Sequence, residues 1–477
     1  MNLDNFLPLD KKIKLYENQI FWFLFVVISI FALIIRLKFF IYNPSLFKDE
    51  ANLALNILST DYSQLFLPLK RFQVSPPLFL IATKLLYNTF HPATAFLSDM
   101  VLRIVPFISG VIAIPAFGIL LRKILKNKYI VLLGMLLLSY SQCAITMSSY
   151  LKQYSTEMLA TILILLLTFY INLKEKSLIK MFVILLIYII FPFLSFTSIF
   201  LIPLCFWYLI RRALKIHLAK SKIILLSFIP VIVIVCFGVY IWGYNGNYKM
   251  MFQQWMHFIP IWKYVLTLFI SAFFMFLLKT RKTFLCFIVV SVIAYLCSFN
   301  IYHSVDRLIL FILPLIITGV LCPFLYVIRS FKVLRLFQLL FIIYTLLFLS
   351  AGAIKNYNPK VYKYKREYSR ELWDDLSKSA NKNSVLLFGL SKNTNLYYNK
   401  FYLKNNKHID CKRNIEIFKN LKPGEYFYIV TSKRNYNRRY YSNLERQKVL
   451  GFAKKIDKNA SISKNIYGVS YYVKFKK

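Results

Sequence analysis

Long apolar stretches separated by short basic clusters dominate the first three-quarters of the chain. The first stretch runs from about Ile20 to Tyr42, and similar stretches recur as far as Ala351. Most are about 17–23 residues long, which is the length that crosses the hydrocarbon core of a bilayer as an α-helix. The pattern therefore predicts a polytopic α-helical membrane protein.

The apolar stretches predict about eleven transmembrane helices in total. After the first, their approximate bounds are Val101–Leu121, Ile130–Met147, Met158–Ile171, Leu178–Leu194, Ser195–Ile210, Ile223–Trp242, Tyr264–Leu278, Phe284–Phe299, Leu308–Val327 and Leu334–Ala351.

One further apolar segment, Pro77–Phe90, is too short for a clear span and carries Lys84. We expect it to form a helix along the membrane surface. On that assumption the basic clusters at 122–128, 174–180, 211–222, 279–282 and 329–335 all fall on one side of the membrane. The loops on the cytoplasmic side of a membrane protein carry an excess of Lys and Arg, so the side with these clusters is the cytoplasmic side. If Pro77–Phe90 crossed the membrane, every later cluster would lie outside, so we reject that alternative.

The same rule orients the chain. Lys11, Lys12 and Lys14 precede the first span, which we interpret as a retained anchor with a cytoplasmic N-terminus. The long loop 43–99 is then extracytoplasmic, and apolar residues at helical spacing in Glu50–Leu58 predict an interfacial helix within it. We expect the membrane to be a bacterial inner (plasma) membrane.

The last part of the chain, 355–477, is polar and contains no apolar stretch long enough to span. A helix is predicted at Glu367–Ala380, and strands at Asn383–Leu390, Tyr426–Thr431 and Val469–Phe475. These elements predict a small α/β domain outside the cytoplasm, following a transmembrane domain that covers 1–354.

Composition agrees with a membrane location and narrows the function. The chain is 58% hydrophobic, with a mean hydropathy of +0.56, and Lys and Arg outnumber Asp and Glu by 61 to 19. Because the basic residues follow the ends of spans, we interpret them as topology signals and not as a nucleic-acid surface. The seven cysteines show no metal-ligand spacing. A divalent metal is conceivable but has no support in the sequence.

Two adjacent carboxylates, Asp49 and Glu50, follow the first span in a chain where acidic residues are scarce. Carboxylates near a bilayer are costly, which favours a functional role. One could act as a general base towards an acceptor hydroxyl while the other orients a neighbouring helix. The alternative is a helix N-cap on a solvated loop.

Basic residues at the same membrane face are candidates for binding a phosphate. Arg71, Arg103, Lys152 and Arg307 could hold the phosphate of a lipid or offset the charge of a leaving group. The alternatives are that Lys152 and Arg103 extend to the lipid headgroups, and that Arg307 only pairs with Asp306.

The order of these motifs resembles a known family. A first span followed by Asp49-Glu50, a Pro76-Pro77-Leu78 helix start, an Arg103-x-x-Pro106 motif, a Lys152-x-Tyr154 turn and a late Arg before a span containing Pro is similar to the protein O-mannosyltransferase and aminoarabinose transferase family. The resemblance is best from Asp49 to Glu157. Ser75 and Tyr150 stand where family members often carry a basic residue and a Glu.

The resemblance implies a GT-C-fold glycosyltransferase with a polyprenyl-phosphate-sugar donor as its partner. Asp49 would deprotonate the acceptor, which could be a lipid, a glycan or a protein. Lys152, Tyr154 and Arg307 would line the pocket for the donor phosphate, with Arg71 nearby, and Arg103 would support the first loop. The competing functions are a ligase that transfers a polyprenyl-linked glycan, a lipid or sugar transporter, and a non-catalytic scaffold.

Overall fold

The structure is a computed structural model that describes most of the N-terminal half of the chain. The described residues are 7–171 except 72 and 126, 178–215, and shorter segments within 224–235, 310–321, 369–402, 408–432 and 450–476. The spans predicted at 264–278, 284–299 and 334–351 lie outside the described residues, as does Arg307. The predicted number of spans therefore stays a prediction.

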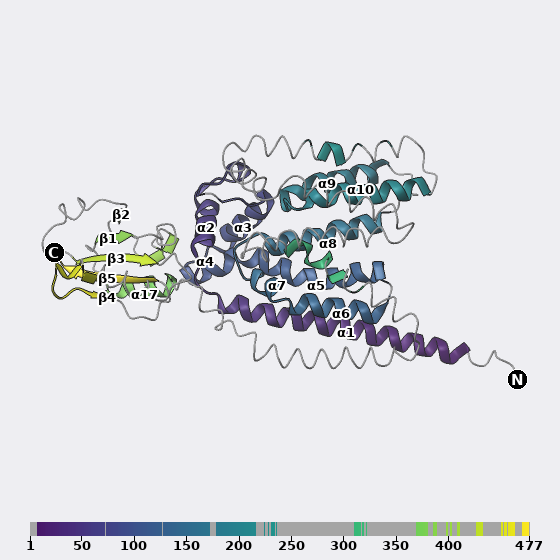
Figure 1. The fold of residues 1–477 in the computed structure, drawn as a ribbon, viewed down its shortest axis with the longest axis horizontal. Helices are drawn as coiled ribbons and strands as arrows, with labels where there is room; N and C mark the ends of the chain where they lie inside the picture. The colour runs from purple at the N-terminus through teal and green to yellow at the C-terminus, as the bar shows by residue number, and fades with distance from the viewer. Residues whose placement is uncertain are drawn as a thin grey trace, which may run out of the picture.

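A bundle of helices forms the larger part of the described structure (Figure 1). Its helices are α1 (Leu7–Tyr42), α5 (Ile104–Leu125), α6 (Lys128–Tyr140), α8 (Tyr154–Tyr170), α9 (Leu178–Leu194) and α10 (Ser198–Lys215). Within the described residues, two helical stretches are long and apolar enough to cross a membrane, at Tyr16–Tyr42 and Ala95–Leu125. The buried apolar core of the bundle lies mainly between α1, α5, α6, α8 and α10. The chain is a helical membrane protein.

The predicted span Ile130–Met147 is wrong in one respect, because it consists of two helices. Helix α6 ends at Tyr140, and α7 (Gln142–Met147) begins after Ser141, whose hydroxyl accepts the Ala144 N–H. The buried guanidinium of Arg36, on α1, donates to the carbonyls of Leu138 and Ser139. A cation at these carbonyls stabilises the end of α6 inside the bundle.

Three helices lie at one end of the bundle, and α1 begins at the opposite end (Figure 1). They are α2 (Lys48–Ser59), α3 (Pro77–Phe90) and α4 (Ala95–Leu102), with the short 3₁₀ helix η2 (Ser63–Phe66) between the first two. The bounds of α3 are those predicted. Pro77 begins it, since proline is well suited to a first helical position, and His91 ends it in the left-handed conformation with φ 41°. That α3 lies along a membrane surface stays a prediction.

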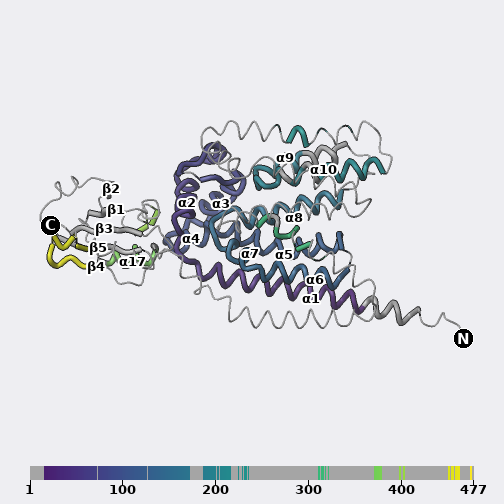
Figure 2. The backbone as a smooth tube through the Cα atoms, viewed as in Figure 1, coloured from purple at the N-terminus to yellow at the C-terminus, as the bar shows by residue number. Residues whose placement is uncertain are grey.

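A five-stranded mixed sheet lies beyond α2, α3 and α4 (Figure 1; Figure 2 traces the same three helices as a tube). Its strands are β1 (Val385–Phe388), β2 (His408–Asp410), β3 (Tyr426–Ser432), β4 (Ser461–Ile462) and β5 (Ser470–Lys476). The order is β2-β1-β3-β5-β4, with β1 parallel to β2 and β3, and β5 antiparallel to β3 and β4. The three predicted strands correspond to β1, β3 and β5. Strands β2 and β4 are too short to give a recognisable sequence pattern.

The C-terminal helix α17 (Ser369–Ser379) joins the sheet to the end of the bundle. A second hydrophobic core contains Leu46 and residues of α2, α3 and α4 together with Leu372, Trp373 and Leu376 of α17. Tyr397 and Tyr398 belong to the same core. The C-terminal residues thus pack directly against the segment that carries the adjacent carboxylates.

Candidate functional site

The segment from Asn43 to Phe47 leads from α1 to α2 and is fixed by its neighbours. Residues 43–46 are buried, and Asn43 has a left-handed backbone with φ 36°. This conformation turns the chain at the end of α1, and asparagine tolerates it better than most residues. The Asn43 side-chain amide donates to the Phe96 carbonyl at 2.8 Å, which links the turn to α4. The carboxylates therefore follow a rigid turn.

Glu50 and Arg103 form a buried ion pair at the start of α2. Each side chain is 1% exposed, and the guanidinium donates to both carboxylate oxygens at 3.0–3.1 Å. Arg103 also donates to the Asn43 side-chain oxygen at 2.9 Å and to the Pro44 carbonyl. A planar guanidinium suits this two-point contact better than an ammonium would.

Glu50 has two further partners, both backbone N–H groups. Phe47 donates to it at 3.3 Å, which is the backward bond of a capping box at the start of a helix. Leu151 donates to it at 2.7 Å from the turn before α8. The sequence grouped Glu50 with the catalytic residues and Arg103 with the substrate-binding residues. In the structure both side chains are committed to protein groups, and this gives them a positioning role.

Asp49 differs from its neighbour. Its side chain is partly exposed in the first turn of α2, and it forms no hydrogen bond or ion pair with any residue that the structure describes. The N-terminus of a helix favours negative charge, so this position suits a carboxylate. Asp49 is thus the carboxylate of the pair that has capacity left for a substrate.

The basic turn before α8 lies against the loop before α3. The Lys152 ammonium donates to the Gln73 side-chain oxygen at 2.8 Å, and the Ser75 hydroxyl donates to Gln153 at 3.4 Å. Arg71 occupies the same loop with φ 63°, and its partial burial lowers the pKa of its guanidinium. The Leu151 N–H donates to Glu50. Because Asp49 precedes Glu50 and Lys152 follows Leu151, this bond links the two segments that carry Asp49 and Lys152.

Two other predicted residues contribute differently. Tyr154 is 8% exposed and packs into the bundle core at the start of α8, so only the edge of its side chain is accessible. Arg307 lies outside the described residues. In the part of the chain that the structure describes, no three His, Cys, Asp or Glu side chains group closely enough to hold a metal ion.

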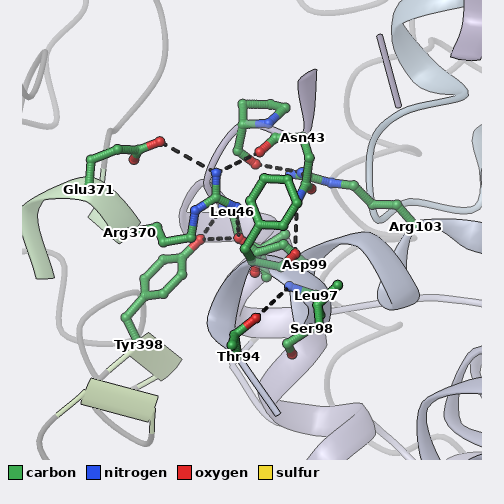
Figure 3. A network of polar contacts seen from close by, with 12 residues as sticks. Asn43, Leu46, Thr94, Leu97, Ser98, Asp99, Arg103, Arg370, Glu371 and Tyr398 are labelled. Atoms are coloured by element: carbon green, nitrogen blue, oxygen red, sulfur yellow. Dashed lines mark hydrogen bonds and ion pairs between the residues drawn. The ribbon is translucent and has the colours of Figure 1, made fainter. Parts of the chain in front are cut away.

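Sequence reasoning missed Asp99, which is fully buried in α4. Its carboxylate accepts hydrogen bonds from Arg370 at 2.9 Å, Tyr397 at 3.0 Å and Tyr398 at 2.8 Å (Figure 3 shows Asp99 with Arg370 and Tyr398). A charge buried this deeply requires such partners. The available signal was a single acidic residue in an apolar helix of an acid-poor chain.

The same C-terminal side chains also contact the segment before α2. Arg370 donates to the Asn43 carbonyl at 2.8 Å, and the Tyr398 hydroxyl accepts the Leu46 N–H at 2.5 Å (Figure 3). Burial, together with the negative charge of Asp99, raises the pKa of the Tyr397 and Tyr398 phenols well above their usual value. Both hydroxyls therefore keep their protons and donate to Asp99.

No protein-family model matches the chain, and no characterised protein sequence matches it significantly. Among solved structures, it is similar to ArnT from Cupriavidus metallidurans bound to undecaprenyl phosphate. The similarity covers 94% of this chain and 97% of that one, with a TM-score of 0.53 and 12% sequence identity. The chain has the GT-C fold. The resemblance seen in the sequence motifs is therefore confirmed at the level of the fold.

A second similar structure is the oligosaccharyltransferase of Archaeoglobus fulgidus, at 12% identity over 90% of this chain and 69% of that one. Its TM-score of 0.43 lies below the level expected of a common fold. Asp49 belongs to the first turn of α2, and α2 lies with α3 and α4 at the end of the bundle next to the C-terminal elements (Figure 1).

Proposed function

We propose that this chain is an integral-membrane, inverting glycosyltransferase. It transfers a sugar from a polyprenyl-phosphate donor to a hydroxyl or similar group of an acceptor at the extracytoplasmic face of the membrane. The observation that carries the proposal is the contrast between Asp49 and Glu50. Glu50 is saturated with hydrogen bonds, whereas Asp49, one residue earlier, has no partner among the described residues.

The proposed reaction uses this contrast directly. Asp49 takes the proton of the acceptor hydroxyl as its oxygen attacks the anomeric carbon of the donor sugar. The bond from that carbon to the phosphate oxygen breaks, and the polyprenyl phosphate leaves with the electron pair. Attack from the face opposite the leaving group inverts the configuration at the anomeric carbon.

The leaving phosphate gains negative charge, and cations near it lower the barrier. In the proposal Lys152 supplies this charge, because Gln73 holds its ammonium beside the loop that carries Arg71. Arg307 is proposed to add a second contact to the phosphate. The fold shared with ArnT, a protein that was crystallised with undecaprenyl phosphate, supports a lipid phosphate as the ligand.

The proposal also places the site on the membrane. The Asp49 end of the bundle and the C-terminal domain face outwards from a bacterial inner membrane, and the N-terminus is cytoplasmic. This orientation rests on the basic clusters and on the position of α2, which lies at the end of the bundle opposite the start of α1 (Figure 1).

Mass spectrometry of host glycolipids, surface glycans and glycoproteins tests the proposal. Cells with the native chain are compared with cells carrying Asp49→Asn or, as a control, Asp61→Asn, an exposed carboxylate in the same loop. We expect one defined sugar to disappear, and its lipid-linked donor to accumulate, in Asp49→Asn cells alone. A profile that changes on deletion of the chain but not in Asp49→Asn would contradict the role of Asp49.

A further inference from the structure

Two neighbouring tyrosines of the C-terminal region bind the same carboxylate. The Tyr397 and Tyr398 hydroxyls donate to different oxygens of Asp99, at 3.0 and 2.8 Å, and all three side chains are fully buried. The two tyrosines are therefore alike in their hydrogen bonds to Asp99, both in type and in length.

The second contact of each hydroxyl sets the two tyrosines apart. The Tyr397 hydroxyl bonds to the Ser98 hydroxyl at 2.7 Å, so both of its contacts are on α4. The Tyr398 hydroxyl accepts the N–H of Leu46, a fully buried residue that precedes α2 (Figure 3). Of the two tyrosines, Tyr398 is therefore the one whose described contacts connect α4 to the segment that leads into Asp49.

Leu46 lies two residues before the first residue of α2 and three before Asp49. A buried backbone N–H without a partner is costly, so the Tyr398 oxygen restricts where the Leu46 peptide can lie. Because Arg370 holds the Asn43 carbonyl at 2.8 Å, C-terminal residues fix the segment before α2 at two points.

We propose that Tyr398 is a positioning residue for the transfer reaction, through which the C-terminal region holds the Asp49 end of α2 in place. The inference rests on the proposed function. Tyr398 acts through the Leu46 backbone and not through substrate, and a small displacement of a general base lowers the rate strongly.

Replacing either tyrosine by phenylalanine tests the proposal on the full chain in lipid nanodiscs. Tyr398→Phe removes the acceptor for Leu46 and one donor to Asp99. Tyr397→Phe is the matched control, because it also removes one donor to Asp99 but leaves the Leu46 contact. Thermal unfolding of both variants checks that their losses of stability are alike.

The first readout is hydrogen–deuterium exchange of the peptide that contains Leu46. We expect the Leu46 amide to exchange about tenfold faster in Tyr398→Phe, as for the loss of one buried hydrogen bond, and at the native rate in Tyr397→Phe. Equal exchange in the two variants would overturn the proposal. This readout does not depend on any catalytic activity.

The second readout is the amount of sugar-modified product per molecule of protein in cells, with Asp49→Asn as the inactive reference. We expect at least a tenfold loss in Tyr398→Phe and little change in Tyr397→Phe. Faster exchange with unchanged product would overturn the positioning role while leaving the proposed function intact. If the native chain itself makes no product, the proposed function fails, and the exchange measurement still decides whether Tyr398 holds Leu46.

Discussion

Glu50 and Arg103 lie 53 residues apart in the chain and meet in a buried pair in which the guanidinium bonds both carboxylate oxygens at 3.0–3.1 Å. The pair fixes three segments at once, because Arg103 also holds Asn43 and Glu50 also holds the Leu151 N–H. Asp49 and Lys152, the proposed base and phosphate ligand, each directly neighbour a residue of this network. The network is thus the frame of the candidate site.

The first prediction concerns the stability of this frame. We expect Glu50→Gln or Arg103→Met alone to destabilise the protein by about 3–5 kcal/mol, because each leaves the other charge buried without its partner. The double variant should be destabilised by clearly less than the sum of the two. Thermal unfolding in detergent, for the native chain and the three variants, measures the coupling. Strict additivity would mean that the pair does not act as a unit.

Alkaline pH should weaken the C-terminal contact. The pKa of the Tyr397 and Tyr398 phenols is raised by burial, so between their unfolded and folded pKa values the folded state holds protons that the unfolded state has lost. Their contribution to stability is therefore complete below pH about 10 and declines above it, by at most about 1.4 kcal/mol per pH unit for each tyrosine. Unfolding temperatures from pH 8 to 11 should fall more steeply for the native chain than for the double Phe variant. Parallel curves would contradict this.

Lys152 should contribute to the binding of a lipid phosphate. Loss of one charged hydrogen bond in Lys152→Met is expected to weaken the binding of undecaprenyl phosphate about 10- to 100-fold. Lys123→Met makes the same change of charge in the last turn of α5, where the ammonium lies over the Tyr170 ring, and should leave the affinity near its native value. Titration of both variants in nanodiscs gives the comparison. Equal affinities would remove Lys152 from the phosphate site.

The proposed orientation predicts which surface residues are accessible from outside the cell. Cysteines replacing the exposed Lys70 and Lys378 should react with a membrane-impermeant maleimide in intact cells, on a background without native cysteines. A cysteine replacing the exposed Lys123 should react only after the membrane is opened. External labelling at 123 would show that the orientation is reversed.

Local sequence patterns predicted much of the helical part. The two prolines and the apolar run after them fix α3 to the residue, and the two carboxylates mark the start of α2. The break between α6 and α7 did not show in the hydropathy pattern, and the carbonyls of Leu138 and Ser139 before it bond to Arg36, about a hundred residues earlier in the chain. A hydropathy pattern reports the length of an apolar stretch and not a hydrogen bond from another helix.

The candidate site shows the same division. The sequence singled out Asp49 because acidic residues are scarce in this chain and costly near a bilayer, and Lys152 because its turn is predicted at the same membrane face. The residues alone left open which of Asp49 and Glu50 is the base, and only the resemblance named Asp49. The contacts of Glu50 with the buried Arg103 and the Leu151 N–H show which carboxylate is occupied. Asp99, Arg370 and Tyr398 are brought together by a long-range contact spanning about 300 residues, which no local pattern encodes.

The fate of the lipid-linked donor tests the central claim most directly. Membranes that contain the native chain or Asp49→Asn are incubated with the donor labelled in its sugar, once the glycan comparison has identified that sugar. We predict that the native chain transfers the label covalently to an acceptor and releases free polyprenyl phosphate, and that Asp49→Asn lowers the rate by about 10²–10⁴-fold. Intact donor that merely moves between leaflets, at the same rate in both samples, would contradict the account and indicate a transporter.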